Sequence, residues 1–501
     1  MRPVPVTDDR VLPLIEELVP PPDPAGCCER LAGLPYRLFL DSAAKGTLGR
    51  YSFLTADPVA IVRSKGPRTE ILDRLAGTRS DIAVDSLAAV RELLAPHAGP
   101  PVPDLPPFQG GAAGYLAYDW GRVHERVPAP RHDDLALPDV VLGVYDWVLA
   151  WDHQMSRAWM ISTGLPETFP ADRTRRAAAR ADAVRRRLQS TVDYQSGAIG
   201  TPGMVFPPRG QSAPSYPVEG GSWSRQLALR SSFTHRGYLE AVTRVREYIF
   251  AGDIFQANVS QRFEAPLVES PWALYCRLRA RNAAPFGAFL DFPEAVVLSA
   301  SPERFLRVDI AGRVETRPIK GTRPRGVGPE HDAALGRALV ESAKDRAENL
   351  MIVDLMRNDL SRVCQPGTVR VSELFALEHY ATVHHLVSTV VGELAPGFNA
   401  LDLLRSAFPG GSITGAPKVR AMEVIAELEP SQRGVYCGAI GYWSVTGSLD
   451  TNIAIRTAVA VNDRVYFSAG GGIVADSDPE QEYQETLDKA LGMIEALATS
   501  A

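Results

Sequence analysis

The C-terminal part of the chain carries the pattern that most restricts its fold. Three strand-like runs follow one another closely there, over 435–445, 451–461 and 464–469. Asn462-Asp463 is a tight-turn signal between the last two runs, and such a turn joins neighbouring strands into an antiparallel pair. A helix is predicted over 479–498, directly after this pair. Strands joined by hairpins and followed by long helices predict an α+β fold rather than a doubly wound parallel sheet.

The rest of the chain divides near its middle. A stretch over 191–232 is rich in Gly, Pro and Ser and has little periodicity, which indicates a linker or a long surface excursion. It separates an N-terminal region, 1–190, from a C-terminal region, 233–501. In the latter we also predict helices over 236–251 and 332–358.

Composition narrows the class of protein. The 501 residues have a formal net charge of −6, which argues against a general nucleic-acid binder. The five cysteines form no Cys-x-x-Cys pair, so we expect neither a disulfide framework nor a structural zinc site. The N-terminus lacks the apolar core of a signal peptide, and no apolar run is long enough to span a bilayer. We therefore expect a cytoplasmic protein with no nucleic-acid or membrane partner.

Four cations crowd the short segment 317–326. Arg317, Arg323 and Arg325 surround Lys320, which is followed by a glycine that leaves its surroundings open. Nearby positive charge disfavours an ammonium group, so the pKa of Lys320 is expected to fall and its neutral amine to act as a nucleophile. The alternative is a basic surface loop or an anion-binding patch in which all four side chains stay charged.

Acidic side chains share a face on each of two predicted helices. Glu482, Glu485 and Lys489 lie on one face of 479–498, and Asp345 and Glu348 lie on one face of 332–358. A solvent-exposed stripe with a mild ion pair is the ordinary interpretation of either face. If glutamates from the two helices meet across a cleft, they form an oxygen-ligand site suited to Mg²⁺.

Two glycine-containing stretches, 408–418 and 468–474, offer backbone amides that could hold an anion. The first leads into an amphipathic helix, and the second ends a strand and lets a ligand approach the backbone at Gly472. An ordinary tight turn is the alternative for both. Arg456 lies in an otherwise apolar strand on the face opposite Ile453 and Ile455, so it needs an anion partner if it is buried.

Glu303 belongs to the segment 301–305, which follows the apolar strand-like run 295–298, and so lies at the end of a predicted strand. A carboxyl group beside apolar residues can have a raised pKa and serve as a general acid. A local salt bridge with Arg304 is the alternative.

Taken together, these segments resemble the chorismate-utilising enzymes. The resemblance covers nearly all of 235–495, and the stretches that carry it are 252–256, 301–305, 317–326, 345–359, 385–388, 410–418, 436–442, 450–456 and 469–489. It implies an α+β fold of large antiparallel β-sheets packed with helices, and chorismate as the substrate. Near the N-terminus, Asp41-Ser42 resembles the tryptophan-binding region of relatives, with an aspartate in place of their glutamate, and we expect a structural pocket there.

Two positions separate the activities within this family. Members that add water have a lysine where this chain has Gln256, and anthranilate synthases typically have alanine where it has Lys320. The resemblance therefore implies the members that make 4-amino-4-deoxychorismate, for 4-aminobenzoate and folate biosynthesis. Anthranilate synthesis on the same scaffold is the alternative, and a catalytically silent chorismate-binding protein is a third hypothesis.

The same resemblance implies a role for each candidate residue. Lys320 would attack C2 of the ring, Glu303 would protonate the departing C4 hydroxyl, and ammonia would enter at C4 and expel the lysine. Mg²⁺, held by Glu348 and Glu485 with Glu482 nearby, would neutralise the ring carboxylate. The expected substrate-binding set comprises Gln256, Thr322, His385, Tyr436, Arg456, Gly472 and Lys489.

Ammonia requires a source. No Gly-x-Cys-x-Gly nucleophile turn surrounds any of the five cysteines. A separate glutamine amidotransferase subunit is therefore the expected partner, with free ammonium as a possible substitute.

Overall fold

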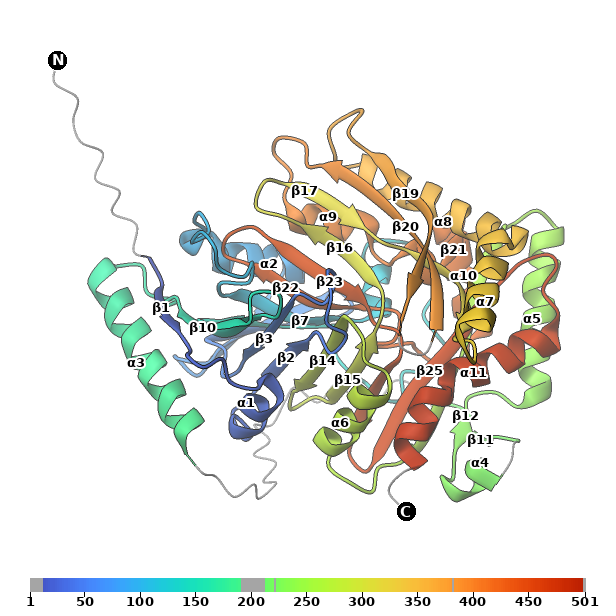
Figure 1. The fold of residues 1–501 in the computed structure, drawn as a ribbon, viewed down its shortest axis with the longest axis horizontal. Helices are drawn as coiled ribbons and strands as arrows, with labels where there is room; N and C mark the ends of the chain where they lie inside the picture. The colour runs from blue at the N-terminus through green and yellow to red at the C-terminus, as the bar shows by residue number, and fades with distance from the viewer. Residues whose placement is uncertain (1–11, 191–211, 220–221, 381–382, 499–501) are drawn as a thin grey trace.

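Two large antiparallel sheets form the centre of the computed structural model, which describes residues 12–190, 212–219, 222–380 and 383–498 (Figure 1). In this described part of the chain the first sheet has 13 strands and the second has 12. Every ladder between these strands is antiparallel. The predicted α+β class is therefore confirmed.

The order of the strands in each sheet differs from their order in the sequence. From one edge to the other, the first sheet contains β1 (Leu14–Glu17), β10 (Arg157–Ser162), β9 (Trp147–Asp152), β3 (Tyr51–Thr55), β2 (Arg37–Asp41), β14 (Phe286–Asp291), β15 (Val296–Ser301), β24 (Thr457–Val461), β25 (Arg464–Ile473), β13 (Gln256–Pro266), β12 (Arg230–Ser231) and β11 (Tyr216–Pro217), with β21 (Gly415–Ala416) paired to β13. The second contains β18 (Ile319–Pro324), β20 (Val383–Glu393), β17 (Arg313–Thr316), β16 (Arg304–Val308), β23 (Leu449–Ile453), β22 (Ala439–Ser444), β7 (Gly111–Leu116), β8 (Val140–Tyr145), β4 (Ala60–Lys65), β5 (Arg68–Asp73) and β6 (Thr78–Ile82), with β19 (Arg370–His379) paired to β20.

The core lies in layers on either side of these sheets. Between them packs an apolar cluster with Leu38 and Phe53 from the first sheet and Tyr115 and Ile440 from the second. Helices cover the outer faces (Figure 1). The outer face of the first sheet packs against α1 (Pro24–Arg30), α3 (Pro170–Gln189), α6 (Pro271–Arg281) and α11 (Pro479–Ala498). The outer face of the second sheet packs against α2 (Ser86–Leu94), α8 (Ala343–Ser361) and α9 (Ala400–Ala407).

A further apolar cluster joins β13 and β25 to helices α5 (His235–Phe250) and α10 (Lys418–Leu428). The remaining helical elements are α4 (Ser222–Gln226), α7 (Pro329–Glu341), and the 3₁₀ turns η1 (Ala95–His97), η2 (Tyr118–Val123) and η3 (Gly411–Ile413). Among the described helices, none has the length and apolar composition needed to cross a membrane.

Both sheets combine strands from either side of the predicted linker 191–232. In the first sheet β2 pairs with β14, and in the second β7 pairs with β22. Residues 191–211 and 220–221 of the linker lie outside the described residues, whereas β11 and β12 extend the first sheet beside β13. The division into 1–190, 191–232 and 233–501 stays a prediction, and the two outer regions share both sheets.

Several predicted elements are confirmed. The helices expected over 236–251 and 479–498 appear as α5 and α11, each with a side-chain cap: Thr234 accepts from Gly237 N at 3.0 Å, and Asp478 accepts from Gln481 N at 3.0 Å. Strands β24 and β25 pair directly on either side of Asn462-Asp463. Asn462 has a φ of 54°, which is the left-handed backbone that this tight turn requires.

The single helix predicted over 332–358 is wrong. The chain forms two helices, α7 and α8, and Ser342 separates them. Ser342 has an extended backbone, with φ of −64° and ψ of 111°, and its hydroxyl accepts from Asp345 N at 3.3 Å. A serine in this conformation caps a new helix, so helical periodicity on both sides concealed the break.

The single strand predicted over 451–461 is also wrong. Strand β23 belongs to the second sheet and β24 to the first, and residues 454–456 carry the chain from one sheet to the other. Arg456 has a φ of 49°, a left-handed conformation that ends strand geometry. The alternation argument that placed Arg456 opposite Ile453 and Ile455 therefore does not apply.

Candidate active site

The candidate site begins where two segments of the chain cross between the sheets side by side. Glu303 lies in the crossing from β15 to β16, and Arg456 lies in the crossing from β23 to β24. Ile453 N donates to Glu303 O at 3.0 Å, and Ala300 N donates to Arg456 O at 3.0 Å. Backbone hydrogen bonds therefore hold these two residues in neighbouring segments, although they are far apart in the sequence.

Lys320 and Gln256 lie together over the backbone of Gly472. A β-carbon added at Gly472 would be 2.1 Å from Gln256 Nε2 and 3.3 Å from Lys320 Nζ. Lys320 is on β18, Gln256 is on β13 and Gly472 is on β25, so three strands of two sheets meet here. The structure thus brings together three residues that were predicted separately.

Gly472→Ala is expected to lower kcat at least tenfold while leaving the thermal unfolding midpoint nearly unchanged. Each tenfold in rate corresponds to about 1.4 kcal/mol of lost transition-state stabilisation. The added methyl group would displace the ends of the Gln256 and Lys320 side chains, whose atoms are the three nearest to it. Steady-state kinetics and a thermal melt measure the two effects. Gly99→Ala is the control, since nothing lies within 4 Å of the added carbon and, as at Gly472, the backbone is not left-handed. Full activity of Gly472→Ala would contradict the proximity of the two side chains.

The pKa of Lys320 is lowered, as predicted, but the predicted cause is wrong. Burial of the amine is the main cause, and the charge of Lys489 adds to it, while Glu348, Glu303 and Glu485 oppose the shift. The three neighbouring arginines are paired elsewhere. Arg317 pairs with Glu378, Arg323 with Asp345 at 2.9 Å, and Arg325 with Asp332 at 2.6 Å.

Glu303 has the properties of a general acid. Its side chain is 4% exposed, and burial raises its pKa to about 7. Contacts with the Ser412 side chain and the Ile319 backbone, and the charge of Lys320, oppose this rise. The alternative salt bridge with Arg304 is absent from the described residues, since Arg304 pairs with Asp450 at 3.0 Å and Glu315 at 2.8 Å.

His385 and Thr322 face each other across the ladder between β20 and β18. Thr322 Oγ1 and His385 Nδ1 are 2.9 Å apart. His385 is 2% exposed, and burial together with the charge of Arg456 lowers its pKa to about 3. The imidazole is therefore neutral near pH 7, and its Nε2 is buried without a hydrogen-bond partner among the described residues.

Arg456 lies close enough to His385 for its charge to lower the pKa of that imidazole. Arg456 itself has no acidic partner among the described residues. Burial lowers the pKa of Arg456, with only a modest opposing effect from Tyr380. Within the described residues its guanidinium group makes no hydrogen bond or ion pair, unlike Arg304 in the neighbouring crossing. A partly buried guanidinium group without a partner is suited to bind an anion.

The predicted acidic residues approach the same place from α8 and α11. Lys489 Nζ binds Glu485 Oε1 at 2.6 Å and Gly470 O at 2.9 Å. Ser477 Oγ donates to Glu482 Oε1 at 2.6 Å, and Glu482 Oε2 is buried without a partner among the described residues. Glu348, on α8, is near enough to Lys320 and Glu485 for their charges to influence its titration.

The three carboxylates differ in their tendency to ionise. Burial raises the pKa of Glu348 and of Glu482. Burial also acts to raise the pKa of Glu485, but the charge and hydrogen bond of Lys489 outweigh it, so the net shift is downward. Two carboxylates that are costly to ionise, beside a third that is ionised, form an environment that a cation would stabilise.

The donor chemistry of Glu348, Glu482 and Glu485 fits Mg²⁺, which prefers carboxylate oxygens and water. The unpartnered Glu482 Oε2 is an available ligand atom. In the described part of the chain, no three His, Cys, Asp or Glu side chains are close enough together to hold a metal ion. The three glutamates therefore offer the kind of ligand atom that Mg²⁺ prefers. In the described structure they do not lie close enough together to form a complete coordination site.

Tyr436 is not joined to the other predicted residues by any hydrogen bond or ion pair of the described chain. It lines a small cavity of about 30 Å³ with Arg433, Thr457 and Ser468, and it contacts the Cys437 side chain. The connection to the site is indirect, since Glu303 is near enough to Cys437 to raise its pKa.

Two residues of the site were missed by sequence reasoning. Ser412, which contacts Glu303, lies within the stretch 408–418 that was interpreted as an anion-binding loop. Lys418 of the same stretch is buried against Asp359 at 2.6 Å, so it is structural. Tyr380 places its ring 5.2 Å from that of His385, and no pattern in the sequence indicates this contact.

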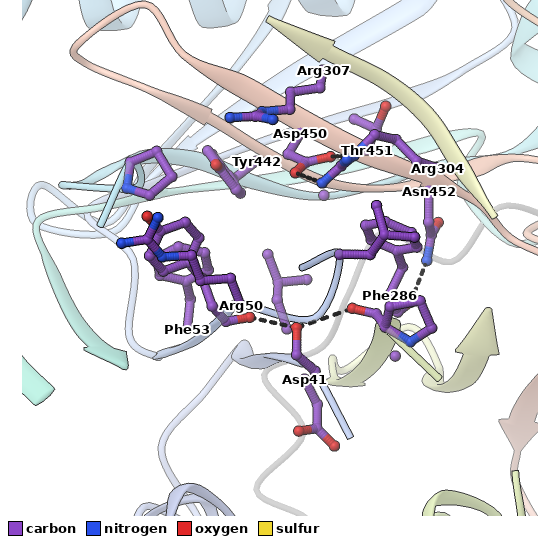
Figure 2. A pocket seen from close by; sticks show the side chains of 18 of the residues that line it. Asp41, Arg50, Phe53, Phe286, Arg304, Arg307, Tyr442, Asp450, Thr451 and Asn452 are labelled. Atoms are coloured by element: carbon purple, nitrogen blue, oxygen red, sulfur yellow. Dashed lines mark hydrogen bonds and ion pairs between the residues drawn. The ribbon is translucent and has the colours of Figure 1, made fainter. Parts of the chain in front are cut away.

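A separate cavity of about 330 Å³ lies between the sheets, lined in part by Arg50, Arg307 and Tyr442 (Figure 2). None of the predicted site residues is among its described lining. Figure 2 shows the Asp41 carboxylate directed away from the cavity. That carboxylate accepts from Tyr275 Oη at 3.1 Å and pairs with Arg279. The predicted Asp41-Ser42 pocket therefore exists, with the aspartate side chain tied to helix α6.

Comparison with known proteins agrees with the fold. The family model of the chorismate binding enzymes matches residues 36–495. The aminodeoxychorismate synthase component 1 of Salmonella typhimurium is 44% identical over 91% of this chain and 92% of its own length. The anthranilate synthase component 1 of Pseudomonas aeruginosa is 40% identical over 94% of this chain and 92% of its own length. The crystal structure of anthranilate synthase component I from Streptococcus pneumoniae superposes with a TM-score of 0.73 at 31% identity, covering 90% of this chain and 93% of that one. This chain therefore belongs to the chorismate binding enzyme family.

Proposed function

We propose that this chain is an aminodeoxychorismate synthase component I, which converts chorismate and ammonia into 4-amino-4-deoxychorismate. The observation that carries the proposal is Lys320, a partly buried amine with a lowered pKa that lies over the Gly472 backbone. A nucleophilic amine at this position distinguishes the proposed reaction from anthranilate formation. The name of the Salmonella typhimurium relative supports the same activity.

The protonation states of two residues suit the first step. Lys320 can lose its proton more easily than an exposed lysine, and Glu303 keeps its proton up to a pH of about 7. The Lys320 amine attacks C2, the ring double bonds shift, and the C4–O bond breaks as Glu303 donates its proton, so the hydroxyl leaves as water.

The second step reverses the first with a different nucleophile. Ammonia forms a bond to C4, the double bonds shift back, and the bond between C2 and Lys320 breaks, which releases the amine. One proton of the new ammonium group passes to the Glu303 carboxylate and restores the acid. The enolpyruvyl group is retained, so a separate lyase would complete 4-aminobenzoate for folate biosynthesis.

The remaining residues would bind and orient the substrate. Arg456 has no anionic partner in the described chain and would hold the enolpyruvyl carboxylate, together with Tyr436 and backbone amides near Gly472. Strand β25 pairs with β13 along one edge, and along its other edge it pairs with β24 only as far as Phe467. On that second edge, Gly470–Ile473 therefore have no ladder partner among the described strands. His385 and Thr322 would orient the ring, Gln256 would line it, and Lys489 would meet an anionic oxygen.

Mg²⁺ is the cofactor that we propose, held by Glu348 and Glu485 with Glu482 nearby. When bound, it would supply positive charge that neutralises the ring carboxylate of chorismate. The unpartnered Glu482 Oε2 and the raised pKa of Glu348 support a cation at this place.

Removal of Mg²⁺ with a chelator is expected to abolish product formation, and added Mg²⁺ is expected to restore it. Glu482→Gln is expected to raise the Mg²⁺ concentration for half-maximal activity by roughly 10- to 100-fold. A Mg²⁺ titration of the steady-state rate measures this shift. Glu480→Gln, at an exposed position on the same helix, is the matched control. Full activity of chelator-treated protein would contradict the cofactor assignment.

A separate glutamine amidotransferase subunit is the proposed source of ammonia. A glutaminase nucleophile must be a thiolate, and the cysteines of this chain are poorly suited to become one. All five are free thiols, and burial raises the pKa of Cys27 and Cys364 to about 11 and of Cys28 and Cys437 to about 12. Free thiols also fit a reducing compartment, so the cytoplasm is the proposed location.

The test is a single incubation of the purified chain with chorismate, Mg²⁺ and ammonium, read by chromatography and fluorescence. Accumulation of 4-amino-4-deoxychorismate, converted to 4-aminobenzoate only when a lyase is added, is the expected result. Direct release of anthranilate would favour the second candidate, which the Pseudomonas aeruginosa relative represents. Chorismate binding without turnover would indicate a catalytically silent protein.

A further inference from the structure

One face of strand β13 carries two amide side chains, those of Gln256 and Asn258, and Gln256 lies with Lys320 over Gly472. Asn258 is directly opposite Gly472 in the ladder between β13 and β25, so its side chain leaves the sheet on the face that Gln256 shares. The intervening Ala257 points to the other face, where it packs with Val259 and Ile473 against α5 and α10.

Both amides carry an unsatisfied acceptor. Gln256 is 1% exposed and Asn258 is 7% exposed. Gln256 Oε1 and Asn258 Oδ1 are buried, and neither has a hydrogen-bond partner among the described residues. A buried carbonyl oxygen without a donor is costly, and two such oxygens on one face indicate a place for a ligand that brings N–H or O–H donors.

The backbone of Asn258 places it between the two reactive residues. Asn258 N donates to Thr414 O at 2.7 Å, and Asn258 O accepts from Arg433 Nη2 at 2.7 Å. Thr414 belongs to the turn whose Ser412 contacts Glu303, while Gly472, across the ladder, lies under Lys320. Asn258 is therefore held between the Gly472 backbone, over which Lys320 lies, and the turn that contacts Glu303.

Chorismate is a poor match for these two acceptors. Its carboxylates and ether oxygen are themselves acceptors, and its single hydroxyl is the group that leaves. Ammonia, in contrast, has three N–H donors and one lone pair. Two neutral carbonyl oxygens can accept two of these hydrogens and leave the lone pair free. A neutral acceptor pair also stabilises the ammonium form less than a carboxylate pair would, so the nucleophilic form is not disfavoured.

We propose that Asn258 and Gln256 together form the binding site for the incoming ammonia, with their amide oxygens as its acceptors. This inference rests on the proposed amination of chorismate and adds the residues that select and orient the second substrate. It makes Asn258 a residue that contacts substrate.

The experiment varies ammonium at fixed pH and saturating chorismate and Mg²⁺, with wild type and Asn258→Leu. Leucine keeps the approximate shape and removes the acceptor. The expected result is a rise of about tenfold in the KM for ammonia, the size of one lost hydrogen bond to a buried group. The KM and equilibrium affinity for chorismate are expected to be unchanged. Ser260→Ala is the matched control, since Ser260 shares the strand and the face and contacts Glu429 instead.

An unchanged KM for ammonia in Asn258→Leu, or equal increases in both KM values, would overturn the site. If the thermal melt shows that Asn258→Leu does not fold, Asn258→Asp decides, because it keeps an acceptor oxygen. Its KM for ammonia is expected to stay at or below the wild-type value, and a tenfold rise would overturn the site.

The KM for ammonia can be measured whichever aminated product forms. Failure of the wild-type protein to aminate chorismate would overturn the proposed function, whereas normal amination with an unaffected Asn258→Leu would overturn this site alone.

Discussion

Lys320→Ala is expected to lower the rate of 4-amino-4-deoxychorismate formation by several orders of magnitude, since loss of a covalent nucleophile removes the intermediate itself. The amine lies 3.3 Å from a β-carbon position on Gly472 and near Glu303, Glu348 and Glu485. The neighbouring Lys489 amine is paired with Glu485 at 2.6 Å, so alanine leaves no unpaired amine in the place of Lys320. Chromatography of the products formed from chorismate, Mg²⁺ and ammonium measures the loss. Lys45→Ala, at an exposed position, is the matched control.

The covalent role has its own readout. Wild-type protein incubated with chorismate and Mg²⁺ without ammonia is expected to gain the mass of chorismate minus water, and Lys320→Ala is expected to gain none. The variant is also expected to bind chorismate and to permit a different product such as anthranilate, because direct attack by ammonia becomes the remaining route. Full formation of the 4-amino product by Lys320→Ala would reject the covalent role, although not the family.

Glu303→Gln is expected to lower kcat by roughly 10²- to 10⁴-fold, the usual contribution of a positioned general acid. Glutamine keeps the shape and can still meet Ser412, but it has no acidic proton to give to the departing hydroxyl. Chorismate affinity, measured by equilibrium titration, is expected to change little. Glu315→Gln, which removes a partner of the adjacent Arg304 instead, is the control for altered charge near this crossing.

The pH profile separates this role from a structural one. Burial raises the pKa of Glu303 to about 7, and the reaction needs its protonated form, so the rate is expected to fall as pH rises above about 7. Lys320 must instead lose its proton, and its lowered pKa extends the active range toward neutral pH, with the rate falling at lower pH. The wild-type profile is therefore bell-shaped, and Glu303→Gln is expected to lose the alkaline limb. Retention of that limb in Glu303→Gln would contradict the assignment.

Local sequence patterns predicted the elements whose signals are themselves local. The Asn462-Asp463 turn, helix α5 and helix α11 depend on contacts within a few residues, such as the cap that Asp478 provides. The two misread elements share one cause. The helix-capping serine Ser342 interrupts a helical pattern, and the left-handed backbone at Arg456 interrupts a strand pattern. The residue types on both sides of each break fit one continuous element. Side-chain periodicity reports which faces are apolar, and it does not report a change of backbone direction.

The case of Lys320 shows the same limit for electrostatics. Its sequence neighbours Arg317, Arg323 and Arg325 suggested the correct direction of the pKa shift for the wrong reason. Each of these arginines is paired with its own acidic partner, and charges that are paired and partly solvated have little effect on a third group. Burial, which depends on residues from the whole chain, is what lowers the pKa.

The sequence by itself determined the fold class, the candidate reactive residues and the chemistry that their types permit. Those features follow from local propensity and from side-chain chemistry, which a residue carries wherever it lies. Only the tertiary structure decided that Glu303 and Arg456 lie in adjacent crossings, that Gln256 and Lys320 meet over Gly472, and that Asn258 stands beside them with a free acceptor. Proximity between distant segments, and the loss of water that comes with it, arises from the packing of two sheets against each other, and no short stretch of sequence encodes it.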